Sequence, residues 1–291
     1  MDAQLDNYPL IVVLGETASG KSALSMELAK RFNGEIIAAD SRTVYRLMDI
    51  GTAKPTQLDQ ALIPHHLIDI VNPTDNFTVF DFKDKAQRAI EAIYSKKRIP
   101  FLVGGTGLYI DALLYDYGFL PAASKGIRER LSSLSVDELK AKLENKGIYH
   151  LKDNRNPRHL IRALETNGVL PTKKALRANT LLIGLKVERD ELQKRIESRV
   201  DSMVNSGLVD ELKYLTETYG WDFPAMQSTG YSAFRNYLDG TATLEEAKKE
   251  FMQNDMHLAK RQRTWFKRNK EINWILNTEE AVDLVTTFLN K

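Results

Sequence analysis

Residues 15–22 combine the residue types that bind phosphate groups. They follow the apolar run Leu10–Leu14 and precede a segment of helical composition. Strand, glycine loop and helix in this order form the context in which the pattern Gly-x-x-x-x-Gly-Lys-Ser/Thr holds a phosphate chain. The loop amides and the helix N-terminus would face the phosphates, Lys21 would add a positive charge, and Ser22 could hold Mg²⁺. The predicted phosphate loop comprises Gly15, Glu16, Thr17, Ala18, Ser19, Gly20, Lys21 and Ser22.

This pattern leaves open whether the phosphates belong to a nucleotide or to another diphosphate. A second reactive group, Asp40, ends a short predicted strand over residues 35–40. Ligands bind at the carboxyl ends of strands in open parallel sheets, so Asp40 should face the same crevice as the phosphate loop. Its carboxylate could bind magnesium, act as a general base, or only cap the next turn with Ser41. Residues 41–55 have no clear period and are predicted to be a loop that lines the site.

Two further features should lie near this crevice. Residues 104–107, Gly-Gly-Thr-Gly, follow the apolar strand predicted at residues 99–103 and form a second glycine-rich turn. Two such turns after neighbouring strands would place amides on both sides of one pocket. Arg195 and Arg199 share one face of a later helix. They could lean over the phosphates, or pair on the surface with Glu191 or Glu197.

The elements that position these groups predict an α/β fold with a parallel core like that of P-loop NTPases and helices on both faces. Strands are expected at residues 10–14, 35–40, 64–70, 99–103 and 180–187. The alternation of strands and helices stops at Asp116, and residues 117–177 carry helical patterns interrupted by Pro157 and Pro171. We therefore predict a core of residues 1–116, 178–200 and 268–291, with helical parts at 117–177 and 201–267.

Charge is distributed unevenly along the chain. The net charge of the 291 residues is only +2, but residues 125–177 hold 13 basic and 6 acidic residues, and residues 260–270 hold six basic residues and no acid. These segments indicate either a polyanionic partner or merely solvated helical faces. Trp265 and Phe266 lie among the later basic residues, as in proteins that bind single-stranded RNA. The rings could instead only dock the helix.

Composition excludes several classes of protein. No cysteine is present, so disulfide frameworks and thiolate zinc sites are ruled out. The first residues lack the basic and apolar regions of a signal peptide, and no apolar run approaches the length needed to span a membrane. We expect a cytoplasmic protein without a membrane partner.

The whole set of motifs resembles that of bacterial tRNA dimethylallyltransferases over nearly the full length of the chain. The segments that carry the resemblance are residues 15–22, 40–41, 44–46, 48–55, 64–69, 103–109, 162–165, 259–262 and 264–266. The sequence departs from the usual pattern at Glu16, where the family usually has proline, at Thr43, often glutamine, and at Leu47, usually glycine. None of these differences removes a charged group from the proposed chemistry.

The resemblance implies transfer of a dimethylallyl group from dimethylallyl diphosphate to N6 of the adenosine immediately 3′ of a tRNA anticodon, with release of diphosphate. The loop amides, Lys21, Mg²⁺ on Ser22 and Arg199 would stabilise the departing diphosphate. Asp40 would accept the proton of the amine. The implied tRNA contacts are Asp40, Ser41, Arg42, Thr43, Thr106, Arg128, Arg158, His159, Leu160, Ile161 and Arg162, and the basic aromatic helix adds Lys260, Arg261, Arg263 and Trp265.

Three other functions fit parts of the sequence. A free-adenylate isopentenyltransferase would share the chemistry, but the large basic insertion disfavours it. A small-molecule kinase with a phosphate loop would not account for the basic aromatic helix, and an RNA-binding module would not need Asp40 beside an intact phosphate loop. The predicted partners are dimethylallyl diphosphate and a tRNA anticodon stem-loop, the predicted cofactor is Mg²⁺, and a monomer is expected. Which tRNAs are modified stays open.

Overall fold

The computed structural model describes residues 8–120, 125–149 and 155–290. The chain divides into two compact units, one of Met1–Leu114 with Arg177–Lys291 and the other of Tyr115–Leu176. Within the described ranges, no helix has both the length and the apolar character needed to cross a membrane.

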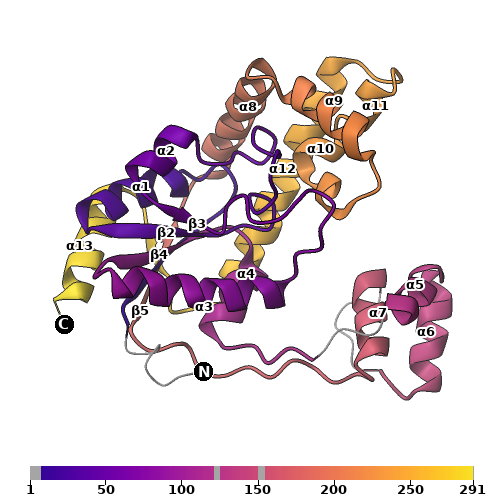
Figure 1. Ribbon diagram of the computed structural model, residues 1–291, viewed down its shortest axis with the longest axis horizontal. Helices are drawn as coiled ribbons and strands as arrows, with labels where there is room; N and C mark the ends of the chain where they lie inside the picture. The colour runs from indigo at the N-terminus through magenta and orange to yellow at the C-terminus, as the bar shows by residue number, and fades with distance from the viewer. Residues whose placement is uncertain (1–7, 121–124, 150–154, 291) are drawn as a thin grey trace. The chain divides into compact units, whose positions relative to one another are not determined.

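The larger unit is built on a six-stranded sheet with the order β3-β2-β4-β1-β5-β6 (Figure 1). All neighbouring strands pair in parallel, which confirms the predicted α/β fold. The strands are β1 (Leu10–Leu14), β2 (Gly34–Ala39), β3 (His65–His66), β4 (Ile99–Gly104), β5 (Thr180–Leu185) and β6 (Asn273–Ile275). The strand expected at residues 64–70 is only two residues long, because Leu67 and Asp69 have positive φ angles of 65° and 56° that turn the chain away.

Helices cover both faces of this sheet. Apolar residues of α1 (Lys21–Arg31) and α13 (Thr278–Leu289) pack against Ile11, Val13 and Ile183 on one face. Figure 1 shows α3 (Val79–Ser95) on the opposite side of the sheet from α1, and α4 (Gly107–Leu114) packs beside α3. Burial on both faces explains why the central strands are continuous apolar runs.

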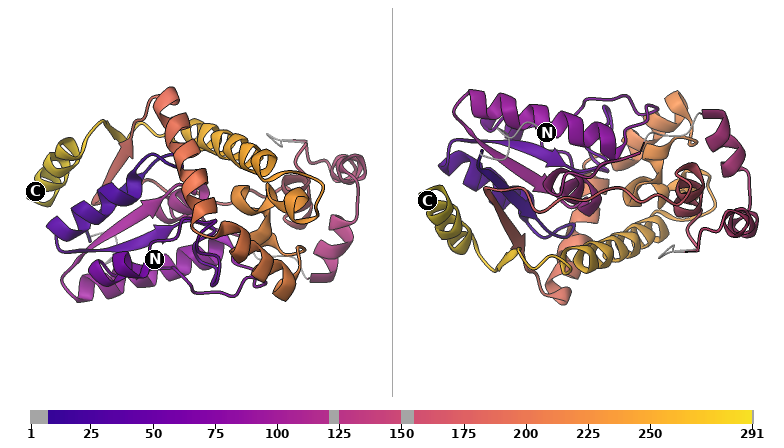
Figure 2. Two further views of the ribbon diagram at one scale, coloured as in Figure 1. Left: turned by 90° about the horizontal axis from the view of Figure 1, so that it is seen from above. Right: turned by 90° about the horizontal axis from the view of Figure 1, so that it is seen from below.

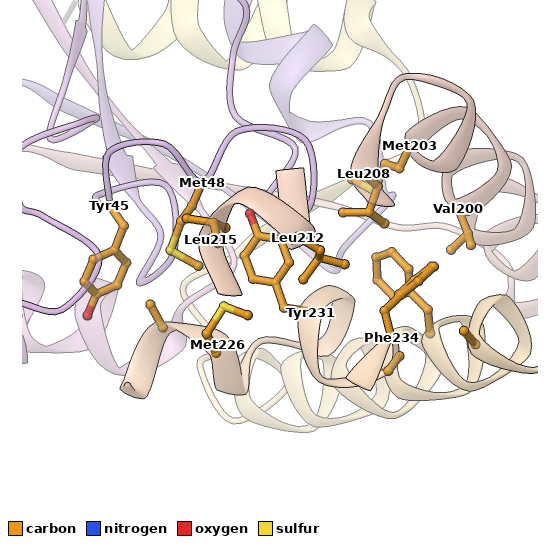
Figure 3. Close-up of a cluster of buried hydrophobic side chains, with 14 of the residues drawn as sticks. Tyr45, Met48, Val200, Met203, Leu208, Leu212, Leu215, Met226, Tyr231 and Phe234 are labelled. Carbon is orange, nitrogen blue, oxygen red and sulfur yellow. The ribbon is translucent and has the colours of Figure 1, made fainter. Parts of the chain in front are cut away.

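A second core joins the loop after β2 to the later helices of the larger unit. The helices are α8 (Arg189–Asn205), α9 (Leu208–Tyr219), the 3₁₀ turn η2 (Pro224–Gln227), α10 (Thr229–Ser232), α11 (Arg235–Leu238) and α12 (Leu244–Phe266), while α2 (Gln57–Leu62) follows the loop itself. Figure 3 shows Met48 of the loop beside Leu215 and Met226, and Tyr231 beside Leu212. These buried apolar contacts hold a non-repetitive segment in one position.

Polar contacts fix the same loop. The carboxylate of Glu211 accepts hydrogen bonds from the backbone amides of Asp49, Ile50 and Gly51 at 2.8, 2.8 and 2.9 Å. The Tyr231 hydroxyl donates to the same carboxylate at 2.7 Å. A carboxylate that accepts four hydrogen bonds satisfies amides that would otherwise be unpaired, so the loop is tightly anchored on α9.

The smaller unit is a helical subdomain with its own core. Its helices are α5 (Lys125–Ser132), α6 (Val136–Asn145) and α7 (Pro157–Glu165), and Leu139, Leu143 and Leu160 are buried among them. Pro157 does not interrupt a helix but begins α7, at the position where proline's missing N–H costs nothing. The buried side chain of Glu165 forms ion pairs with Arg128 and Arg162, both at 3.0 Å. This carboxylate therefore organises two of the basic side chains of the unit.

A buried carboxylate lies near the amino end of β2. Glu35 is 1% exposed and contacts His66 Nε2 at 2.6 Å, Arg98 at 3.1 Å and Lys96 at 3.2 Å. Burial alone would raise the pKa of Glu35, but the hydrogen bonds from His66 and Lys96 outweigh burial and lower that pKa. Because the folded pKa lies below the unfolded one, Glu35 stabilises the fold at neutral pH, and this contribution is lost as the pH falls through the folded pKa.

We expect Glu35→Gln to lower the free energy of unfolding by about 2 kcal/mol at pH 7, since hydrogen bonds to a charged group are lost. The difference from the wild type should shrink as the pH falls through the folded pKa of Glu35, which lies below the ordinary value of a glutamate. Urea unfolding at pH 7 and at a pH below that folded pKa measures both values. Glu91→Gln, an exposed change on α3, is the matched control. An equal loss of stability at both pH values would contradict the assignment.

Candidate active site

The carboxyl ends of four neighbouring strands form one edge of the sheet. Leu14 of β1 pairs with Gly104 of β4 and with Gly184 of β5, and Gly104 also pairs with Ala39 of β2. The phosphate loop, the second glycine turn and Asp40 therefore leave the sheet side by side. Figure 2 shows the arrowheads of the strands directed towards α8 and α12, which pack against each other. Side chains from both helices reach this edge.

The phosphate loop has the backbone geometry that anion binding requires. Gly20, with φ of 94°, is the N-cap of α1, and Lys21 is the first residue of the helix. A left-handed residue at this position favours glycine, and the first amides of α1 have no partner within the helix. These amides and the positive end of the helix dipole are suited to bind phosphate oxygens.

Lys21 folds back over the loop. Its Nζ donates to the carbonyl oxygen of Glu16 at 3.0 Å. Burial and the neighbouring Arg199 lower the pKa of Lys21 to about 8, although Asp40, Asp255 and Glu16 oppose that shift. A desolvated ammonium beside another cation gains free energy when an anion approaches, so Lys21 is well suited to hold a diphosphate.

The arginines of α8 reach the phosphate loop. The Arg199 guanidinium donates to the hydroxyl of Thr17, and Arg195 Nη1 donates to the carbonyl oxygen of Ser19 at 3.2 Å. Arg195 also pairs with Glu191 at 2.8 Å, so it adopts both arrangements that the sequence allowed. Arg199 is the more buried of the two, with 25% of its side chain exposed against 44% for Arg195.

Asp40 caps the turn that follows it and keeps one oxygen for other contacts. Its Oδ1 accepts from the backbone amides of Arg42 and Thr43 at 2.7 and 3.4 Å. The Ser41 amide donates to Thr106 Oγ1 at 3.2 Å, which ties this turn to the second glycine turn. Among the described residues, none donates a hydrogen bond to Asp40 Oδ2. Capping therefore fixes the orientation of the carboxylate without occupying both of its oxygens.

Gln262 of α12 joins the two glycine turns. Its Oε1 accepts from the backbone amide of Thr17 at 2.8 Å, and its Nε2 donates to the carbonyl oxygen of Gly105 at 3.1 Å. A methyl group on Gly105 would lie 2.3 Å from Nε2, so the absence of a side chain there is required for this contact. The sequence motif around residue 262 contains the residue, but only the fold shows that it spans the site.

We expect Gln262→Glu to lower kcat/KM of the dimethylallyl transfer that the resemblance implies by about tenfold to hundredfold, because the donor to Gly105 is lost and a negative charge is placed beside the phosphate loop. Gln253→Glu makes the same change at an exposed position of α12 and should have little effect. Steady-state kinetics compare the two variants, and near-ultraviolet circular dichroism shows whether each of them is folded. Equal effects of the two substitutions would remove Gln262 from the site.

Two residues that were predicted to contact tRNA have partners within the larger unit. Arg263 forms a bidentate ion pair with the buried carboxylate of Glu16, in which Nη2 lies 2.9 Å from Oε2. Trp265 Nε1 donates to Asp111 Oδ2 at 3.0 Å, and a methyl group on Gly107 would lie 2.4 Å from the indole ring. Trp265 thus docks α12 on the second glycine turn, which is the alternative that the sequence left open. Their tRNA contacts stay predictions.

The other predicted tRNA contacts fall into exposed and buried groups. Lys260, Arg261, Arg158 and His159 are exposed, Arg42 donates to the carbonyl oxygen of Pro224 at 3.0 Å, and Thr43 is buried. Leu160 and Ile161 lie in the core of the helical subdomain and are 0% and 8% exposed, so their side chains stabilise that unit.

Comparison with known proteins identifies the family. A family model described as IPP transferase matches residues 43–269. The chain belongs to the IPP transferase family. A curated relative in Anoxybacillus flavithermus, named tRNA dimethylallyltransferase, is 42% identical over 287 residues, which cover 94% of this chain and 92% of the relative. A tRNA dimethylallyltransferase of Bacillus subtilis is 40% identical over 91% of this chain and 90% of its own length.

Solved structures place the fold in the same family. The full-length tRNA isopentenylpyrophosphate transferase of Bacillus halodurans has a TM-score of 0.74 and 39% identity, with 98% of this chain and 96% of that chain covered. A eukaryotic dimethylallyltransferase solved in action on tRNA has a TM-score of 0.74 and 27% identity, with 92% of this chain and 74% of that chain covered. These matches confirm the resemblance and the fold class inferred from the sequence. The chain is therefore a prenyltransferase.

Proposed function

We propose that this chain transfers the dimethylallyl group of dimethylallyl diphosphate to N6 of the adenosine immediately 3′ of the anticodon in tRNA. The observation that carries the proposal is the meeting of the phosphate loop, Arg199 and the Asp40 carboxylate at one edge of the sheet. Such a site can bind a diphosphate and accept a proton beside it. The relatives named tRNA dimethylallyltransferase support tRNA as the acceptor.

The chemistry requires stabilisation of a leaving group. The bond between the allylic carbon and the diphosphate oxygen breaks, its electron pair stays on the diphosphate, and the N6 lone pair forms the new carbon–nitrogen bond. Lys21, Arg199 and the first amides of α1 hold the negative charge that develops on the diphosphate. Donors that are already oriented stabilise this charge without reorganisation during the reaction.

Asp40 accepts the proton that N6 loses as the new bond forms. The hydrogen bonds to Oδ1 hold the carboxylate in one orientation, which leaves Oδ2 for the amine. Proximity adds to this effect, because a base held at hydrogen-bond distance from the amine replaces a bimolecular proton transfer to solvent.

Magnesium suits the oxygen chemistry of the loop. Ser22 is exposed in the first turn of α1, and its hydroxyl would hold Mg²⁺ together with oxygens of the substrate. When bound, the ion would neutralise part of the diphosphate charge. In the described ranges, no group of three histidine, aspartate or glutamate side chains could hold a metal ion by itself. A hydroxyl oxygen beside a diphosphate site fits Mg²⁺, which prefers oxygen ligands and is often held through substrate phosphates.

Recognition of the tRNA rests on exposed basic residues. Lys260 and Arg261 of α12, and Arg158 and His159 of α7, present their side chains to solvent. Lysine and arginine side chains of this kind contact phosphates and position the RNA. The target adenine must leave the loop stack to reach Asp40, and a hairpin loop makes this extrusion cheaper than a duplex does.

Incubation with an unmodified anticodon arm, MgCl₂ and dimethylallyl diphosphate, followed by nucleoside mass analysis, tests the function. We expect one dimethylallyl group on the adenosine 3′ of the anticodon, and no product when the loop is paired into a continuous duplex. Efficient alkylation of free AMP would favour the adenylate-specific reaction. ATP-dependent phosphorylation of a small acceptor without alkylation would favour a kinase.

A further inference from the structure

A buried carboxylate on α12 lies close to the phosphate loop and has no role in the chemistry described above. Asp255 is 1% exposed, and its Oδ1 accepts a hydrogen bond from Thr229 Oγ1 at 2.7 Å. Its Oδ2 is buried and has no hydrogen-bond partner among the described residues. An isolated buried carboxylate is costly, so a compensating charge is expected beside it.

That charge is Arg199. Its Nη1 lies 3.8 Å from Asp255 Oδ2 while the same guanidinium donates to the Thr17 hydroxyl. Arg199 Nε is also buried without a hydrogen-bond partner in the described chain, so an unpaired donor and an unpaired acceptor lie close together. Burial raises the pKa of Asp255, and Arg199, Thr229 and Lys21 oppose this effect.

Asp255 interacts electrostatically with both cations of the site. Lys21 and Arg199 repel each other, and both are attracted by this carboxylate. Arginine has a long side chain with many rotamers, so a carboxylate that pairs with the guanidinium restricts its position over the phosphate loop. A fixed guanidinium binds a developing negative charge better than a mobile one, since its orientation is set before the reaction.

Asp255 cannot replace Asp40 as the proton acceptor. With 1% of its surface exposed it has no access to an adenine delivered from solvent, whereas Asp40 lies at the partly exposed edge of the site. Asp255 can act only on groups that are already inside the protein. The Arg199 guanidinium is such a group, since its Nη1 lies 3.8 Å from Asp255 Oδ2, and it also contacts the phosphate loop.

We propose that Asp255 is a positioning residue that holds the Arg199 guanidinium over the phosphate loop, and that Thr229 orients Asp255 for this purpose. The inference rests on the proposed transfer function for its kinetic consequence. The coupling between residues 255 and 199 does not rest on that function, because it can be measured by diphosphate binding alone.

A double-mutant cycle on the full chain tests the coupling. Asp255→Asn is nearly isosteric and should lower kcat/KM for dimethylallyl diphosphate by about tenfold to hundredfold, because the Arg199 guanidinium loses the opposite charge that holds it. Arg199→Gln should lower it at least as much. The double variant should be no worse than Arg199→Gln alone, because Asp255 acts through Arg199. Thr229→Val should cause a smaller loss of about threefold to tenfold.

A control variant separates this effect from a general loss of charge. Asp201 of α8 is half exposed and pairs with Lys248 at 2.7 Å. Asp201→Asn should leave kcat/KM within about twofold, as is usual for exposed ion pairs. Thermal unfolding of every variant shows whether a kinetic loss reflects unfolded protein.

Three outcomes would overturn the inference. They are additive losses in the double variant, an Asp255→Asn enzyme with wild-type kcat/KM, and tighter binding of diphosphate by that variant. Calorimetric titration of inorganic diphosphate into the same four proteins repeats the cycle without tRNA. If the binding losses of the variants are non-additive but the wild-type protein alkylates no tRNA, the proposed function is refuted and the coupling stands. Additive losses beside normal alkylation would refute the coupling alone.

Discussion

Asp40→Asn is expected to lower turnover by about 10²- to 10⁴-fold, the usual contribution of a general base. Asparagine keeps an oxygen that can accept from the amides of Arg42 and Thr43, so the turn should persist. Binding of diphosphate and of the anticodon arm should therefore change little. Single-turnover kinetics at saturating substrates, together with separate titrations of both ligands, measures the two effects.

Asp75→Asn provides a control for the turn itself. Asp75 Oδ2 accepts from the backbone amide of Asn72 at 2.8 Å, so it makes a comparable local contact away from the phosphate loop. This variant should keep wild-type turnover. An Asp40→Asn enzyme that retains near wild-type turnover would eliminate Asp40 as the base.

The second large effect is expected at Lys21. Its ammonium should interact more strongly with the diphosphate as charge builds on it, so Lys21→Ala should lower kcat as well as raise KM. A loss in kcat of about 10²- to 10³-fold corresponds to the removal of one preorganised donor from such a site. Initial rates over a range of dimethylallyl diphosphate concentrations separate the two constants.

Lys30→Ala, an exposed change on the same helix, should affect neither constant. If Lys21→Ala raises KM and leaves kcat unchanged, the side chain contributes equally to the ground state and the transition state. Lys21 would then be a binding residue without a role in the chemical step.

Local sequence was sufficient for the parts of the site whose geometry depends on neighbours in the chain. The phosphate loop lies between β1 and α1 as predicted, since glycine at position 20 and the flanking apolar periods act within a few residues. Asp40 follows β2 for the same reason, and the parallel sheet brings both to one edge. β3 is the exception. The sequence predicted a strand up to residue 70, but Leu67 and Asp69 adopt left-handed conformations and the strand ends at His66.

Contacts between distant residues decided the rest. The basic aromatic end of α12 was compatible with RNA stacking or with docking of the helix. In the fold, Trp265 docks on the second glycine turn and Arg263 pairs with Glu16 across 247 residues of sequence. Glu16 itself stands where the family usually has proline, and only its partner explains how a buried carboxylate is tolerated in a loop for anions.

The sequence by itself determined the phosphate loop, the position of Asp40 and the resemblance to the family, because these depend on short-range backbone preferences and on motifs. Tertiary structure alone decided which polar groups from distant parts of the chain pair with the residues of the site. Gln262 lies 245 residues from Thr17, yet it accepts from its amide. Asp255 reaches Arg199 from another helix. Burial and pairing of charges depend on packing between elements, and no local pattern specifies a partner that arrives from elsewhere in the chain.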